Sequence, residues 1–190
     1  AKSNGRLSFL LPGKLDSDYR RKFAEADLNL LFAPKGPGPA FLFKIADTLI
    51  QTMGYEYVLI DARTGLTDLG AMSVFQLPDL VVLVYNLNEQ NLAGTEQIHN
   101  AVIQRRESRD AVPVILLANM IPSDPPEIRK AKLADLAKRG LHTHHVIPLR
   151  PARLLSELIP AFHPEAEGKE DFKPIVDNIL ARSRIRSEDE

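Results

Sequence analysis

Short apolar runs alternate with polar segments along most of the chain. A continuous apolar run bounded by turn-forming residues is typical of a strand buried on both faces of a parallel sheet. The runs that this pattern predicts as strands are Leu7–Leu11, Tyr57–Ile60, Leu80–Tyr85, Val114–Ala118 and His144–Leu149.

Helical spacing of apolar residues marks the segments between these runs. Asp16 or a nearby serine is suited to cap the first helix, Pro126 fits a first helical turn, and Gly140 fits a helix stop. The first helix is expected to bury one face, formed by Tyr19, Phe23, Ala26 and Leu30. The segments predicted as helices are Asp16–Phe32, Ala40–Met53, Asn91–Arg106, Pro126–Arg139, Ala152–Ile159 and Phe172–Arg186.

The alternation of strands and helices predicts an α/β fold. Right-handed crossovers would give a mostly parallel sheet of about five strands, with helices on both faces. We find no internal repeat and no convincing boundary, so residues 1–190 are predicted to form a single domain. Residues 187–190 are highly polar and are predicted to be a disordered tail.

Composition narrows the possible function. The chain has no cysteine, which excludes disulfides, thiolate catalysis and cysteine-bound zinc. A formal net charge of −1 argues against nucleic-acid binding by the whole surface, although Arg182, Arg184 and Arg186 could reach phosphates. The chain has neither an apolar run long enough to cross a membrane nor an export signal, so we expect a cytoplasmic protein that does not associate with membranes.

The sequence from Tyr57 to Gly65 carries the clearest chemistry. A predicted strand ends on Asp61, and Gly65 follows four residues later. Ligands of α/β proteins collect at the carboxyl ends of the strands. An aspartate there can hold magnesium or its water shell, and a glycine lets a backbone N–H approach a phosphate. The alternative is structural: Asp61 caps a helix and Gly65 forms a turn.

Several stretches, in the same order, resemble the ParA/MinD-like branch of P-loop ATPases, the deviant-Walker family. The resemblance extends from about Leu7 to Arg186. The segments that carry it are Phe9–Gly13, Tyr19–Lys22, Tyr55–Gly65, Gln76–Asp79, Asn88–Asn91, Asn119 and Pro148–Pro151.

The resemblance implies an ATP-dependent switch that binds ATP and Mg²⁺ at a homodimer interface, hydrolyses ATP slowly and positions or regulates a protein partner. Asp61 matches the acid that ends the Walker B strand and reaches magnesium through water. Gly65 matches the second switch, whose backbone senses the γ-phosphate. Arg63 stands where better-known members have a proline, and its role is open: it could touch a phosphate or a partner subunit, or form a surface salt bridge.

The resemblance also implies a base-binding pocket. Asn119 matches an asparagine that contacts adenine, and an amide can donate to and accept from a purine edge at once. Its alternative role is to form a turn after a strand. Pro148 and Arg150 match a later loop whose backbone groups often complete the pocket.

A phosphate loop is missing. The segment from Lys35 to Ala40 has prolines at positions 37 and 39, which remove two backbone donors, and Gly13-Lys14 is followed by Leu15 rather than a hydroxyl residue. The fold is therefore expected to be an incomplete P-loop ATPase that lacks the Walker A strand, loop and helix. Either the chain is the C-terminal part of an ATPase, or it is a non-enzymatic interaction module on a degenerate scaffold. We expect the 190 residues alone to bind ATP weakly or not at all.

The histidines near the last predicted strand are a weaker signal. His142 and His144 would share one face of a strand, and His145 would point away. Two imidazoles could chelate a metal, but no close third ligand is evident, so polar residues at a strand edge are the favoured interpretation.

Overall fold

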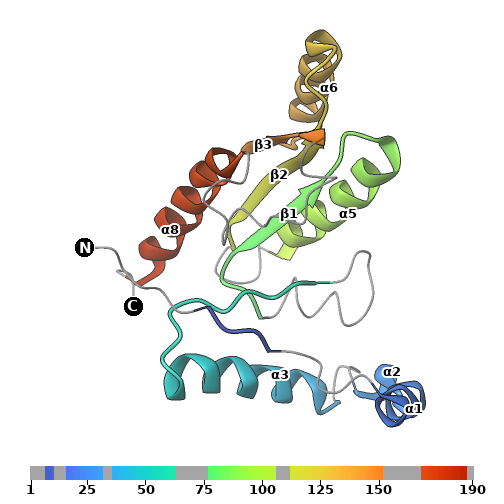
Figure 1. Cartoon of the computed structure of the whole chain (residues 1–190), viewed down its shortest axis with the longest axis vertical. Helices are drawn as coiled ribbons and strands as arrows, with labels where there is room; N and C mark the ends of the chain where they lie inside the picture. Colours follow the sequence, from blue (N-terminus) through green and yellow to red (C-terminus); the bar gives the residue numbers. More distant parts are fainter. Residues whose placement is uncertain are drawn as a thin grey trace. The chain divides into compact units, whose positions relative to one another are not determined.

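The computed structural model describes residues 7–10, 16–31, 36–62, 77–105, 112–151 and 168–187 (Figure 1). Contacts divide the chain into two compact units, Ala1–Glu56 and Tyr57–Glu190.

The helices of the first unit are short. The predicted helix Asp16–Phe32 is two helices, because the backbone of Ala26 is extended and ends the first of them. Asp27 then begins the second helix by accepting a hydrogen bond from the N–H of Leu30 at 3.0 Å, a local bond that competes with a continuous helix. The helices and turns of this unit are α1 (Ser17–Glu25), α2 (Leu28–Leu31), α3 (Gly38–Asp47) and the π-helical turn η1 (Thr48–Thr52).

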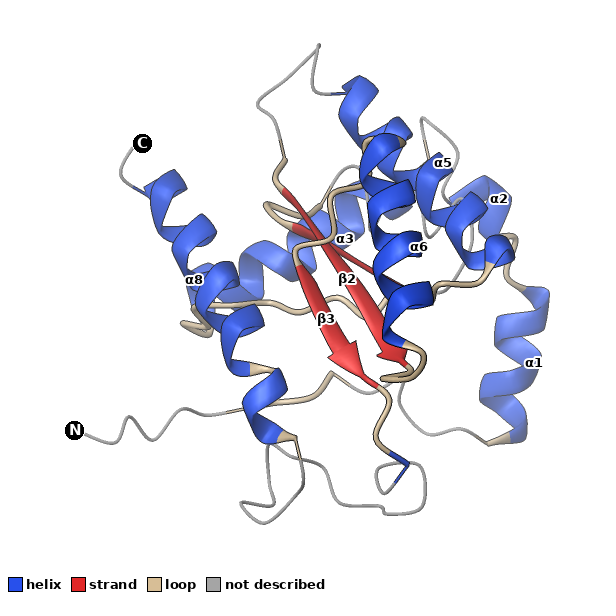
Figure 2. Cartoon of the chain, turned by 90° about the horizontal axis from the view of Figure 1, so that it is seen from above, coloured by secondary structure: helices blue, strands red, loops and turns tan. Residues whose placement is uncertain are grey.

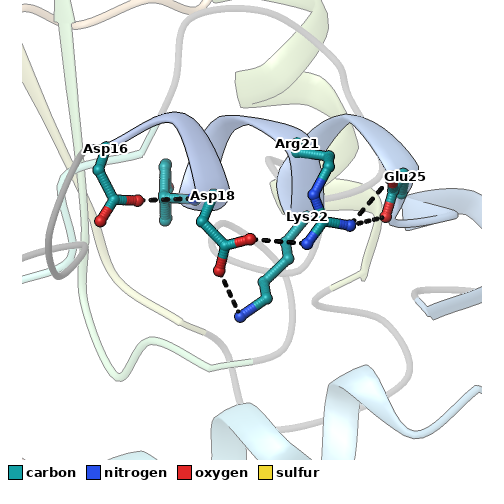
Figure 3. A network of polar contacts seen from close by, with 6 residues as sticks. Asp16, Asp18, Arg21, Lys22 and Glu25 are labelled. Carbon is teal, nitrogen blue, oxygen red and sulfur yellow. Dashed lines mark hydrogen bonds and ion pairs between the residues drawn. The ribbon is translucent and has the colours of Figure 1, made fainter.

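The N-terminal cap of α1 is confirmed. The Asp16 carboxylate accepts a hydrogen bond from the N–H of Tyr19 at 2.9 Å (Figure 3). The exposed ion pairs of this helix connect Asp18 to Arg21 and Lys22, and Arg21 to Glu25 (Figure 3). Such exposed pairs stabilise a helix only slightly.

The expected buried face of the first helix is wrong in part. Ala26 lies at the end of α1 and is exposed, and Leu30 in α2 is 70% exposed. The physical reason is the break at residues 26 and 27, which interrupts the helical period on which the prediction depended.

The predicted helix Ala40–Met53 is confirmed with small shifts at its ends. α3 begins at Gly38 and continues directly into η1. Gly54 follows with φ +71°, a conformation that favours glycine and ends the helical segment.

A three-stranded parallel sheet forms the centre of the second unit, which confirms the α/β class. The strands are β1 (Val81–Tyr85), β2 (Val114–Ile121) and β3 (His145–Pro148), in the order β1-β2-β3. Val81 pairs with Val114, and Leu117 pairs with His145.

Two predicted strands are not strands in the structure. Residues 7–10 and Tyr57–Ile60 have no regular secondary structure. The side chain of Leu59 is 83% exposed, which is the opposite of what a strand at the centre of a parallel sheet requires. An apolar run becomes such a strand only when neighbouring strands pair with its backbone, and no described residue does so here.

Helices cover both faces of the sheet. Asn88 caps the first of them by accepting a hydrogen bond from the N–H of Asn91 at 2.9 Å. Gly140, at φ +83°, ends the second, and the N–H of Leu141 returns to the carbonyl of Leu136, as in a Schellman motif. The helical elements are α5 (Glu89–Arg105), α6 (Pro126–Lys138), the 3₁₀ turn η2 (Lys169–Asp171) and α8 (Lys173–Ser187).

The sheet separates two apolar clusters. α5 and α6 lie on one side of it and α8 on the other (Figure 2). Leu92 and Val102 of α5 and Leu136 of α6 pack with alternate residues of β1 and β2 in the larger cluster. Ile175 of α8 packs with Leu117 and Ile147 in the smaller one. On α5, the apolar residues Leu92 and Val102 are buried, and the polar residues Thr95 and His99 are buried as well.

Other predictions have mixed outcomes. In α6, Ile128 is exposed because it lies in the first turn of the helix, away from the cluster around Leu136. Ser187, which was predicted to begin a tail, is the last residue of α8. Residues 188–190 lie outside the described residues, and so does the predicted helix Ala152–Ile159. Among the described helices, none has the length and apolar character needed to cross a membrane.

Candidate functional site

A cavity of about 360 Å³ opens at the carboxyl ends of the three strands. Val84 lies near the end of β1, Asn119 near the end of β2, and Pro148 ends β3. This edge of a parallel sheet is where α/β proteins bind ligands. The residues that line the cavity are Val84, Leu117, Asn119, Met120, Ile147, Pro148, Leu149, Arg150 and Phe172.

A bulge in β2 shapes the cavity. Ala118 pairs with Val146 and Ile121 pairs with Pro148, so three steps along β2 oppose two along β3. The extra residue changes which side chains face each side, because strand side chains alternate. Ile121 therefore joins the same apolar cluster as Ala118, although the two are an odd number of residues apart.

Backbone strain accompanies the bulge. Met120 has φ +52°, a left-handed conformation that is unfavourable for a residue with a long side chain. Strained residues and bulges concentrate next to binding sites, so this outlier marks the end of β2 as a candidate functional position. The N–H of Leu149 donates to the carbonyl of Ile121 at 2.8 Å and fixes the loop after β3 against the bulge.

Asn119 supplies the amide of the cavity. It lies within the bulge of β2 and is half-buried. An amide presents both a donor and an acceptor, and therefore suits a ligand edge with the complementary pair.

Arg150 lies at the rim of the cavity and is held by two acidic residues. Its Nε donates to Oδ2 of Asp171 at 2.9 Å, and its Nη2 donates to Oδ1 of Asp171 at 3.0 Å. Nη2 also reaches Oε1 of Glu170 at 3.0 Å. This bidentate geometry is the strong form of an arginine–carboxylate pair. Both side chains of the Arg150–Asp171 pair are largely covered, at 25% and 12% exposed.

The cavity is suited to an uncharged ligand group. Among the described residues that line it, Arg150 alone carries a charge, and two carboxylates already neutralise that charge. Most of the remaining lining is aliphatic or aromatic. Apolar walls with one amide fit a flat heteroaromatic ring better than they fit a phosphate.

The predicted site residues divide into two groups. Asn119, Pro148 and Arg150 come together around the cavity. Asp61 is exposed, belongs to a segment without regular structure and does not line the cavity. Gly65 and Arg63 lie outside the described residues.

The histidines near β3 have structural partners. Nδ1 of His144 accepts a hydrogen bond from the N–H of Leu116 at 3.0 Å, and Nε2 of His145 lies 2.9 Å from the side-chain amide of Asn178. Burial, and then the positive charge of Arg182, lower the pKa of His144 below its ordinary value. Both imidazoles therefore contribute to strand and helix packing.

Among the residues of this site that sequence reasoning missed, Met120, Asp171 and Phe172 bear most on its shape and charge. Met120 gave no signal, because neither its bulge nor its positive φ follows from residue type. Phe172 was assigned only as the start of a helix, and Asp171 was not considered. Arg150 itself was a signal for Asp171, because an arginine that is partly buried beside an apolar pocket needs an acidic partner.

Comparison with protein-family models, curated proteins and solved structures finds no match to this chain.

Proposed function

We propose that this chain is part of a ParA/MinD-like ATP-dependent switch, in which ATP is bound and slowly hydrolysed at a homodimer interface to position or regulate a protein partner. The chain would contribute the base-binding pocket and the Walker B and second-switch residues. A phosphate loop encoded upstream would supply the remaining part. The resemblance of segments from about Leu7 to Arg186 to this family motivates the proposal.

One observation supports it best. The three residues that the resemblance implies for the base pocket, Asn119, Pro148 and Arg150, line one cavity at the carboxyl ends of parallel strands. Asn119 on β2 lies about 30 residues before Pro148 and Arg150, and the parallel pairing of β2 with β3 brings the ends of the two strands together. Apolar walls with the amide of Asn119 are the chemistry that an adenine base would require.

Asp61 is the residue that we propose for magnesium binding. In the proposed active protein Asp61 would hold the ion or its water shell, which is hard-oxygen chemistry that a carboxylate supplies. Magnesium would neutralise charge on the phosphates during phosphoryl transfer. Within the described part of the chain no three potential ligands gather around a common point, so Asp61 would share the ion with ATP and the upstream loop.

The proposal extends to the sheet. In the complete protein we expect Tyr57–Ile60 to be a strand and the sheet to reach about five strands. Support comes from the exposed apolar side chain of Leu59, which is 83% exposed. Among the described residues, no strand pairs with the edge of β1 that faces away from β2, so a further strand of the complete protein would pair there.

The test is to extend the gene product upstream of Ala1 and measure ATP hydrolysis with magnesium. We expect an in-frame K-G-G-x-G-K-[ST] motif, slow ATP turnover, and loss of that turnover in the Asp61→Ala variant of the extended protein. Asp135→Ala, which removes an exposed carboxylate from α6, is the matched control and should retain turnover. Unchanged hydrolysis in the Asp61→Ala variant would refute the assignment.

A non-enzymatic interaction module is the second candidate. The observation in its favour is the absence of a phosphate loop from the sequence. A start codon close to Ala1, together with no nucleotide binding by the chain, would support this alternative.

A further inference from the structure

Polar contacts of Arg150 at the cavity join the segment after β3 to the turn η2. Arg150 lies just beyond β3, after Leu149, and its guanidinium donates two hydrogen bonds to the Asp171 carboxylate, at nitrogen–oxygen distances of 2.9 and 3.0 Å. Glu170 adds a third contact at 3.0 Å. Arg150, which lines the cavity, is thus tied to η2.

The same contact sets the position of an aromatic ring. Phe172 follows Asp171 immediately and lines the cavity. Its N–H donates to the carbonyl of Lys169, and its own carbonyl accepts from Ile175 and Val176 at the start of α8. A shift of Asp171 would therefore move Phe172 with it, because the two are adjacent in a hydrogen-bonded turn.

We propose that the Arg150–Asp171 pair is a positioning latch that holds Phe172 as the stacking wall of a pocket for an uncharged planar ring, such as a purine base. This inference rests on the proposed function and deepens it. Arg150 acts through Phe172 and does not contact the phosphates, since its charge is neutralised by Asp171 and Glu170.

Two features distinguish the Arg150–Asp171 pair from the ion pairs within α1 and α8. Asp171 is only 12% exposed, whereas the carboxylates of the α1 and α8 pairs are more than half exposed. The contact also joins segments about 20 residues apart, whereas those pairs lie within a single helix. A covered contact between segments limits loop movement far more than an exposed pair within a helix does.

The experiment is a titration of the isotope-labelled 190-residue chain with adenosine, followed by NMR. Adenosine carries the ring without phosphates, and inorganic tripolyphosphate is the second probe. We expect weak adenosine binding with shifts at Asn119 and Phe172, and no tripolyphosphate-induced shifts at these residues. Asp171→Asn should weaken adenosine binding about fivefold or more, because the Arg150–Asp171 pair would no longer hold Phe172 in place. A fivefold loss of affinity corresponds to about 1 kcal/mol.

Asp177→Asn is the matched control, because it breaks the exposed Lys173–Asp177 pair on α8 by the same chemical change. It should leave the adenosine affinity unchanged. Phe172→Leu should weaken binding as Asp171→Asn does, and the double variant should bind no more weakly than either single one, because both remove the same stacking wall. If Asp171→Asn fails to fold, Arg150→Lys provides the same test, since lysine keeps the charge but loses the bidentate contact.

The outcomes separate the two proposals. Adenosine binding that is unaffected by Asp171→Asn and Arg150→Lys would overturn the latch while leaving the base pocket intact. Tripolyphosphate binding at Arg150 would overturn the inferred preference for an uncharged ring. No adenosine binding by the unmodified chain would overturn the base pocket and the latch together.

Discussion

The backbone of Leu116 in β2 and the side chain of His144 form a 3.0 Å hydrogen bond, in which the N–H of Leu116 donates to Nδ1 of the imidazole. The N–H of His144 in turn donates to the carbonyl of Leu116 at 2.9 Å. An imidazole nitrogen that accepts a hydrogen bond carries no proton, so this geometry requires the neutral form of His144. The contact therefore links the pairing of β2 and β3 to pH.

Acidification should destabilise the fold through His144. Burial, and then the charges of Arg182, His145, His142 and His99, lower its pKa below the ordinary 6.5. The unfolded chain then binds a proton more readily than the folded chain does, so the contribution of His144 to stability is complete above about pH 6.5 and is lost as the pH falls below it. Urea unfolding followed at several pH values between 8 and 5 measures this dependence.

His144→Asn is the informative variant, because its amide oxygen can accept the bond from Leu116 but does not titrate. It should reduce the pH dependence of the unfolding free energy between about pH 6.5 and pH 5. A slope equal to that of the unmodified chain would exclude His144 as the source.

Removing apolar side chains should distinguish the packed core from the exposed segment before Asp61. Leu116→Ala should lower the free energy of unfolding by about 2 to 5 kcal/mol, because Leu116 is 1% exposed and a cavity would remain. Leu59→Ala makes the same chemical change at a residue that is 83% exposed and should cost less than about 0.5 kcal/mol. Denaturant unfolding measures both, and a large loss at Leu59 would mean that this residue is packed.

The comparison between Leu116 and Leu59 also explains which parts of the fold could be predicted from sequence. Val114–Ala118 and Tyr57–Ile60 are similar apolar runs, and composition predicts both as strands. Only the first is a strand, because β1 and β3 pair with its backbone on both sides. Strand formation depends on partners that are distant in sequence, which a local pattern does not contain.

Local signals were more reliable for helices and for part of the site. Asp16 and Gly140 act within a few residues, so the helix ends that they mark were predicted correctly. Asn119 was found through a resemblance, but the positive φ of Met120 next to it arises from the mismatch between β2 and β3. Such a mismatch is a property of a strand pair and cannot be read from one strand.

Two glycines should respond to alanine in opposite ways. Gly94 lies inside α5, and an added Cβ there would meet no atom within 4 Å. Gly94→Ala should therefore stabilise the fold by about 0.5 to 1 kcal/mol, because alanine restricts the unfolded chain and favours the helix. Gly140 has equal space but a φ of +83°, so Gly140→Ala should destabilise the fold by about 1 to 2 kcal/mol.

Each glycine variant is the control for the other, since both add one methyl group in open space. Thermal unfolding followed by circular dichroism compares them directly. Destabilisation by both variants would mean that the added methyl group itself is harmful, and that the difference in backbone conformation does not govern the effect.

Met120 offers a direct test of strain at the candidate site. Its φ of +52° costs a residue other than glycine about 1 kcal/mol or more, whereas asparagine tolerates the left-handed region. Met120→Asn should therefore raise the free energy of unfolding by about 0.5 to 1 kcal/mol, since the side chain is half exposed and little packing is lost. The same substitution at Met53, an exposed residue with φ −94°, is the control and should give no gain.

A stabilised Met120→Asn variant that binds adenosine less well would show that the strained bulge serves the cavity. In that case the natural methionine would keep an unfavourable backbone conformation for the sake of ligand binding. Destabilisation by more than about 1 kcal/mol would show instead that the methionine side chain contributes to packing and that the strain is small.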